Sequence, residues 1–108
     1  MSTEGKFYVE NSSNVSITGS VTYHDRPESR INFTNLKPGE STPKKSFSSG
    51  AGTKDSWYYD YSQGNNIRKG DKDCAFYDKD QAGPVVISIG DNSFKVSPDI
   101  SGSCVKDF

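Results

Sequence analysis

Apolar and polar residues alternate without a break from Val15 to His24. One face of this segment would carry Val15, Ile17, Gly19, Val21 and Tyr23, and the other Ser16, Thr18, Ser20, Thr22 and His24. Because successive side chains of a β-strand point to opposite faces, the pattern predicts a strand with one buried side. It is the clearest strand in the sequence, and it makes an all-β fold the first hypothesis.

The residues that supply apolar bulk support that hypothesis. Leu36 is the only leucine and there are three alanines, whereas Val, Ile, Thr and aromatic residues dominate. These residue types favour strands over helices. A length of 108 residues allows one core rather than two. The sequence therefore excludes a helical bundle, a coiled coil and a large catalytic α/β domain.

Charge and aromatic content argue for a folded chain. Hydrophobic residues make up only 31%, but 13 basic residues balance 14 acidic ones, and 12% of the chain is aromatic. A disordered segment would carry unbalanced charge and fewer rings. A net charge of −1 also gives no attraction to a phosphate backbone, so nucleic acid is not expected as a partner.

Short strands separated by turns are expected along the whole chain. The expected strands are 6–10, 15–24, 30–36, 44–48, 55–61, a segment around Ile67, 74–77, 85–89, 93–96 and a short end around Cys104. The expected turns are 11–14, which would close a hairpin, 37–40 as a type II turn, the flexible loop 49–53, 63–66, 70–73 and 90–92. This spacing predicts a single antiparallel β-sandwich domain of about 8–10 short strands spanning residues 1–108. Its predicted core comprises Phe7, Val15, Ile17, Val21, Ile31, Phe33, Trp57, Tyr59, Phe76, Ile87, Phe94 and Val96.

Cys74 and Cys104 are the only cysteines, and their separation does not fit a C-x-x-C redox or zinc motif. They could form one disulfide that ties the C-terminal tail to a central strand. Two reduced, buried thiols are the alternative if the protein stays in the cytosol.

The start of the chain is polar, so no signal peptide is expected, and the protein would be cytoplasmic or non-classically secreted. No apolar run is long enough to predict a transmembrane segment. N-glycosylation sequons occur at Asn11, Asn14 and Asn32, and they would matter only in a secretory pathway.

The best enzyme hypothesis is a small metal-free ribonuclease. His24 is the only histidine, and the segment 24–30 also holds Glu28, Arg26 and Arg30. His24 and Glu28 could transfer protons while an arginine binds phosphate. A solvated loop with charges of both signs is the simpler interpretation.

Four aspartates, Asp71, Asp73, Asp78 and Asp80, raise the question of calcium. Their spacing departs from an EF-hand loop, and Lys72 and Lys79 offset their charge. Solvated turns explain them better, and neither a metal nor a cofactor is predicted.

The strongest candidate site is the aromatic strand 55–61 with the turn after it. A sugar presents an apolar C–H face and a ring of hydroxyl groups, so its binders pair a stacking ring with fixed acceptors. If Trp57 and Tyr59 fill the core, Tyr58 and Asp60 point to solvent. The predicted ligand-binding residues are Tyr58, Asp60, Tyr61, Asn65 and Asn66, with Asp55 as a supporting acceptor.

Three stretches, 9–13, 52–60 and 92–97, resemble aegerolysins, which are small, acidic β-sandwich proteins. That resemblance implies recognition of membrane lipids and partnership with pore-forming proteins. The Ser/Thr/Asn-rich character also resembles that of fungal fruiting-body lectins and defence proteins.

The leading expectation is a non-enzymatic carbohydrate-binding protein, and a lipid head group is the alternative ligand. Because one shallow site binds a single sugar weakly, a homodimer or larger assembly is expected.

Overall fold

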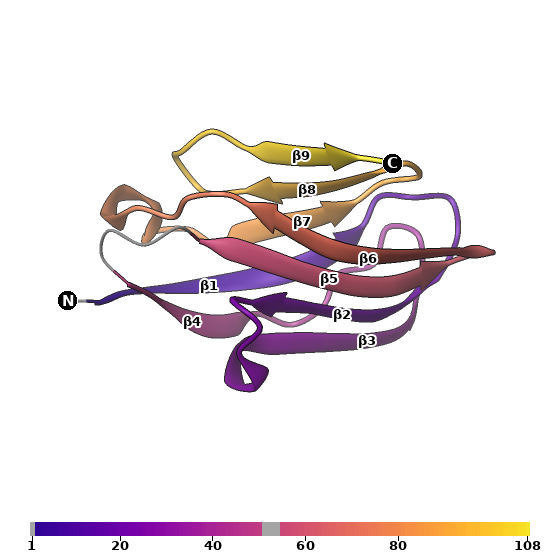
Figure 1. Cartoon of the computed structure of the whole chain (residues 1–108), viewed down its shortest axis with the longest axis horizontal. Helices are drawn as coiled ribbons and strands as arrows, with labels where there is room; N and C mark the ends of the chain where they lie inside the picture. The colour runs from indigo at the N-terminus through magenta and orange to yellow at the C-terminus, as the bar shows by residue number, and fades with distance from the viewer. Residues whose placement is uncertain (1, 51–54) are drawn as a thin grey trace.

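The computed structural model describes residues 2–50 and 55–108, and within them two β-sheets pack face to face (Figure 1). The strands are β1 (Ser2–Asn11), β2 (Ile17–Tyr23), β3 (Arg30–Leu36), β4 (Lys45–Gly50), β5 (Ser56–Gln63), β6 (Asn66–Asp73), β7 (Val85–Ile89), β8 (Ser93–Ser97) and β9 (Cys104–Asp107). Two single-turn 3₁₀ helices, η1 (Pro27–Ser29) and η2 (Asp78–Asp80), interrupt them. The predicted all-β sandwich is confirmed.

One sheet has the strand order β4-β1-β7-β8-β9 and the other β3-β2-β5-β6. All neighbouring strands are antiparallel except β1 and β7, which are parallel. The strands run roughly along the long axis of the molecule, with the two termini at opposite ends (Figure 1).

The predicted hairpin between the first two strands is wrong, because β1 and β2 lie in different sheets. Buried Asn11 organises the crossing between them. Its side-chain nitrogen donates to the carbonyl oxygens of Val15 and Leu36, both at 2.8 Å, and its side-chain oxygen accepts from the backbone and hydroxyl of Ser13. The Asn11 side chain therefore holds the crossover at residues 11–14 in place through four hydrogen bonds.

Two other local predictions are also wrong. Residues 70–73 belong to β6 rather than to a turn, and residues 74–77 follow that strand without forming one. Gly70 has a packing role, since a Cβ there would lie 2.8 Å from the hydroxyl oxygen of Tyr59. A glycine that accommodates a neighbouring ring resembles a turn signal in the sequence.

The type II turn at Lys37–Glu40 has the expected geometry. The Glu40 amide donates to the Lys37 carbonyl at 2.9 Å, and Gly39 has a φ of 84°, which side-chain-bearing residues seldom adopt. The loop expected at 49–53 differs in part, because Ser49 and Gly50 complete β4. Its remaining residues lie outside the described part of the chain.

The core fills the space between the sheets, and it holds every predicted core residue except Val15. Val15 lies before β2 and is 41% exposed, because its backbone belongs to the crossover held by Asn11. Trp57 is at the centre, with edge-to-face contacts to Phe7, Tyr23 and Phe47. Aromatic packing thus supplies bulk that aliphatic side chains usually provide.

A disulfide joins Cys74 and Cys104, which are 30 residues apart in the sequence. Cys74 follows β6 of the four-stranded sheet, whereas Cys104 begins β9 at the edge of the other sheet. The bridge therefore ties the two sheets together near the C-terminal tail.

Removal of this bridge should lower the free energy of unfolding by about 3 to 4 kcal/mol, because the unfolded chain regains loop entropy. Urea unfolding of the Cys74→Ala/Cys104→Ala variant would measure the loss. A reducing agent should destabilise the wild type and leave the double variant unchanged. An unchanged wild type would show that the bridge does not contribute.

Asp80 in η2 anchors the segment before β9. Its carboxylate accepts hydrogen bonds from the amides of Tyr77, Ile100 and Ser101 and from the Ser101 hydroxyl, at 2.7 to 2.9 Å. Burial alone would raise the pKa of this carboxyl, but the hydrogen bonds from Ser101, Tyr77 and Ile100 together lower it below 3.8.

Because the pKa of Asp80 is lower in the folded state, its stabilising effect is full above pH 3.8 and is lost as the pH falls through the folded-state pKa. Asp80→Asn should lose about 2 kcal/mol near neutral pH, since an amide cannot accept all these bonds. The difference in the free energy of unfolding between variant and wild type should become smaller in acid. Unfolding curves from pH 7 to pH 2 would measure it, and a gap independent of pH would contradict the assignment.

Candidate functional site

The outward face of the four-stranded sheet presents polar side chains in aligned rows. Cross-strand register places Arg30, Thr22, Tyr58 and Asp71 in one row and Asn32, Ser20, Asp60 and Lys69 in the next. A third row contains Thr18, Ser62 and Ile67. We call this surface the β2–β5 face. On β2, β3 and β5 these residues face outward because alternation turns most of their neighbours in the chain toward the core.

A hollow of about 580 Å³ lies over the first two rows, which is within the range of small-ligand sites. We call it the Tyr58 hollow. Its lining includes Ser20, Thr22, Arg30, Tyr58, Asp60 and Asp71. Tyr58 is 40% exposed and is the only large apolar side chain of the first two rows that is exposed. The hollow therefore combines one accessible ring with hydroxyl and carboxylate groups.

The charges in this hollow are mostly compensated. An Arg30 guanidinium nitrogen lies 3.8 Å from a carboxylate oxygen of Asp25, and the Lys69 ammonium lies 3.9 Å from that of Asp60. Arg30 also donates from Nε to the Thr22 hydroxyl at 3.0 Å. Asp71 adds a carboxylate, and burial followed by this negative charge raises the pKa of Tyr59 on the adjoining strand.

The structure brings together only part of the predicted ligand set. Tyr58 and Asp60 line the hollow, as alternation suggested. Asn65 and Asn66 are exposed at the β5–β6 turn, beyond the residues that line it. Asp55 and Tyr61 belong to the interior, where they are 2% and 1% exposed.

Tyr61 follows the alternation of β5 and points inward with Trp57 and Tyr59. Its buried hydroxyl has no hydrogen-bond partner among the described residues, and burial raises its pKa. The ring packs near that of Tyr59, with centroids 6.1 Å apart. Its role is therefore packing, and it cannot stack on a ligand.

Asp55 is the centre of a buried hydrogen-bond network. One oxygen accepts from the hydroxyls of Tyr23 and Ser49, and the other accepts from the Phe76 amide at 2.7 Å. His24 Nε2 lies 3.8 Å from the same carboxylate and accepts from the Ser56 amide at 3.2 Å. Every contact of this carboxylate is internal, which identifies Asp55 as a structural acceptor.

Several lining residues were missed by sequence reasoning, among them Ser20, Thr22, Arg30, Lys69 and Asp71. They come from strands on either side of β5, and their proximity depends on strand order. The alternation of 15–24 already placed Ser20 and Thr22 on a polar face. A prediction of which strand pairs with β5 would have found them.

The ribonuclease residues are engaged in other contacts. Arg26 donates to the Ser48 carbonyl at 2.9 Å, and Arg30 contacts Thr22 and Asp25. Within the residues that the structure describes, no hydrogen bond or ion pair joins His24 to Glu28.

The aspartates considered for calcium are also separated. Asp71 and Asp73 lie on β6, whereas Asp78 and Asp80 lie in η2. Across residues 2–50 and 55–108, no group of three His, Cys, Asp or Glu side chains could hold a metal ion. Over the same residues, no helix is long and apolar enough to cross a membrane.

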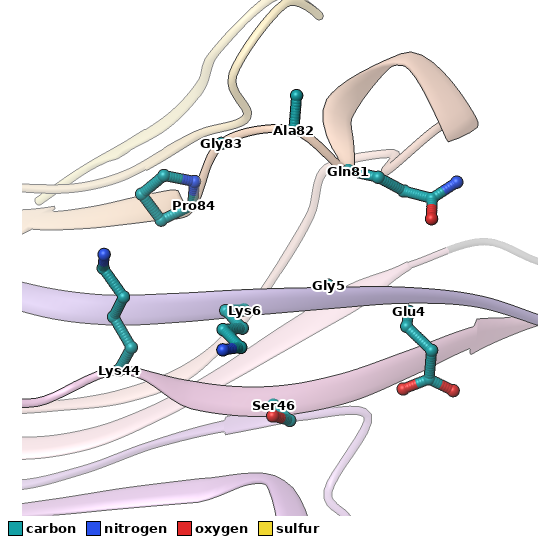
Figure 2. Close-up of a pocket in the computed structure, with 9 residues that line it drawn as sticks. All are labelled: Glu4, Gly5, Lys6, Lys44, Ser46, Gln81, Ala82, Gly83 and Pro84. Carbon is teal, nitrogen blue, oxygen red and sulfur yellow. The ribbon is translucent and has the colours of Figure 1, made fainter.

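A second hollow, of about 320 Å³, lies on the opposite sheet. Figure 2 shows Lys44, just before β4, with its side chain toward the loop 81–84 that precedes β7, and Lys6 on β1. Its polar lining includes these two lysines, Gln81 and Glu4, whose carboxylate accepts from the Ser48 hydroxyl. It has no aromatic side chain, so it does not match the predicted chemistry as the Tyr58 hollow does.

In comparisons with known proteins, no family model matches the chain and no curated protein matches it.

Asp55→Ala should lower the free energy of unfolding by about 3 kcal/mol or more, because Tyr23, Ser49 and the Phe76 amide lose a buried acceptor. Asp60→Ala, at an exposed position on β5, should change the free energy of unfolding by about 0.5 kcal/mol or less. Chemical unfolding of the two variants would test this difference. Equal effects would contradict the structural role of Asp55.

Proposed function

We propose that this protein binds carbohydrate without catalysing a reaction, in the manner of a lectin, and that its site is the Tyr58 hollow. The observation that supports this most is the exposed Tyr58 ring beside Asp60 and the polar side chains of adjoining strands. Strands hold these groups in fixed relative positions, so little order has to be gained when a ligand binds.

The chemistry of the hollow matches that of a sugar. A pyranose ring can place its C–H face on Tyr58, while its hydroxyls meet acceptors at Asp60 and Asp71 and both acceptor and donor at Ser20. Arg30 and Lys69 add donors, which lie 3.8 and 3.9 Å from their carboxylate partners. The hollow therefore offers both an apolar contact and hydrogen bonds of both kinds.

A single ring and a few solvent-accessible hydrogen bonds give modest affinity. Useful retention on a glycan-bearing surface then requires several sites that act together. We infer that the protein works as a dimer or larger assembly, because linked sites raise the apparent affinity without new contacts.

Tyr58→Ala and Asp60→Ala should each weaken glycan binding by about tenfold, since each removes a contact of roughly 1 to 1.5 kcal/mol. A glycan array would identify the bound sugars, and titration calorimetry would measure the affinities. Tyr77→Ala is a matched control, because Tyr77 is another exposed tyrosine away from the β2–β5 face.

A liposome panel run beside the array distinguishes the alternative ligand. Binding only to particular lipids would replace the carbohydrate proposal with recognition of a lipid head group. Glycan binding that survives both substitutions would place the site elsewhere on the molecule.

A further inference from the structure

The Tyr58 hollow has a neighbouring hollow on the same face of the sheet. A third hollow, of about 410 Å³, shares Ser20 and Asp60 with the Tyr58 hollow, and we call it the Ile67 hollow. The Ile67 hollow also contacts Thr18, Asn32, Ser62 and Ile67. Because two side chains line both spaces, the hollows are neighbours over the three rows of the β2–β5 face, and we refer to them together as the groove.

The groove has an apolar contact at each end. Tyr58 lies in the first row, and Ile67, which is 78% exposed, lies in the third row opposite Ser62. Tyr58 and Ser62 are four residues apart on β5, which corresponds to roughly 13 Å at about 3.3 Å per residue. A single pyranose ring is about as wide as a tyrosine ring and cannot reach both ends.

The polar groups between these ends are available to a ligand. Among the described residues, the side chains of Ser20 and Asn32 have no hydrogen-bond partner. They stand side by side on β2 and β3, next to Asp60. The middle row can therefore receive hydroxyl groups from a ring that bridges the two apolar contacts.

The charge of the groove limits the kind of chain. The cations Arg30 and Lys69 are each close to a carboxylate, and Asp71 leaves the lining with an excess of negative charge. An acidic polysaccharide would meet no uncompensated cation there, so a neutral chain is favoured.

We propose, on the basis of the carbohydrate-binding function proposed above, that the groove takes a linear neutral oligosaccharide of several rings along β2 and β5. Tyr58 supports one ring and Ile67 supports a ring farther along. Ser20, Asn32 and Asp60 bind the hydroxyls between them.

The test is a chain-length series. Titration calorimetry with cello-, xylo-, manno- and chito-oligosaccharides of one to four rings should give, for at least one series, a tetramer bound at least tenfold more tightly than its monomer. Binding should change little between low and high salt, because the ligand is neutral.

Variants separate the two ends of the groove. Ile67→Ala should weaken tetramer binding about threefold to tenfold and leave monomer binding unchanged, whereas Tyr58→Ala should weaken both. Ile100→Ala is the matched control, since Ile100 is 63% exposed away from this face.

The outcomes distinguish the two proposals. Equal affinity for monomer and tetramer, or an Ile67→Ala variant that binds the tetramer normally, would overturn the extended groove and keep a single-sugar site. Binding only to charged glycans would also overturn it. No binding to any sugar here or on the glycan array would overturn the proposed function as well.

Discussion

The buried carboxylate of Asp55 is the interaction on which the arrangement of the sandwich depends. It binds Tyr23 of β2 in one sheet, Ser49 of β4 in the other, and the Phe76 amide in the segment after β6. Apolar contact between sheets is not directional, so burial of the aromatic core alone permits several relative positions. The Asp55 bonds select one, because a shift of either sheet would leave buried hydroxyls and a charge without partners.

The candidate groove is built on the strands that this network holds. Asp55 immediately precedes β5, and Tyr23 ends β2, so the two central strands of the four-stranded sheet are fixed at one end of their pairing. Their inward side chains fill the core, and the same alternation exposes Ser20, Tyr58 and Asp60 on the other side. Asp55 thus supports the site through the backbone without touching a ligand.

Period-two alternation was enough to predict the sandwich and the exposure of Tyr58 and Asp60. All but one of the residues that it assigned to the core are buried, but it left out others, among them Tyr23, Phe47 and Tyr61. The alternation pattern failed at positions where contacts with distant residues determine the local structure. Asn11 carries the chain between sheets although its neighbours resemble a hairpin turn, and Gly70 makes room for Tyr59 within a strand. A carboxylate such as Asp55 also gives no sign in the sequence of whether its partners are water or buried hydroxyls. Strand order, which brings Arg30 and Asp71 beside Tyr58, is likewise a property of the whole chain.

The distribution of aromatic rings suggests how such a surface would discriminate among ligands. Most aromatic rings are buried in the core, where Trp57 and its neighbours replace the aliphatic bulk that the chain lacks. Tyr58 is left as the exposed ring of the β2–β5 face, so stacking contributes a contact that every pyranose can make. Discrimination then falls to Ser20, Asn32 and Asp60, whose spacing is set by cross-strand register. Since a mismatched hydroxyl leaves a polar group unpaired, fixed spacing favours one pattern of hydroxyls over its stereoisomers.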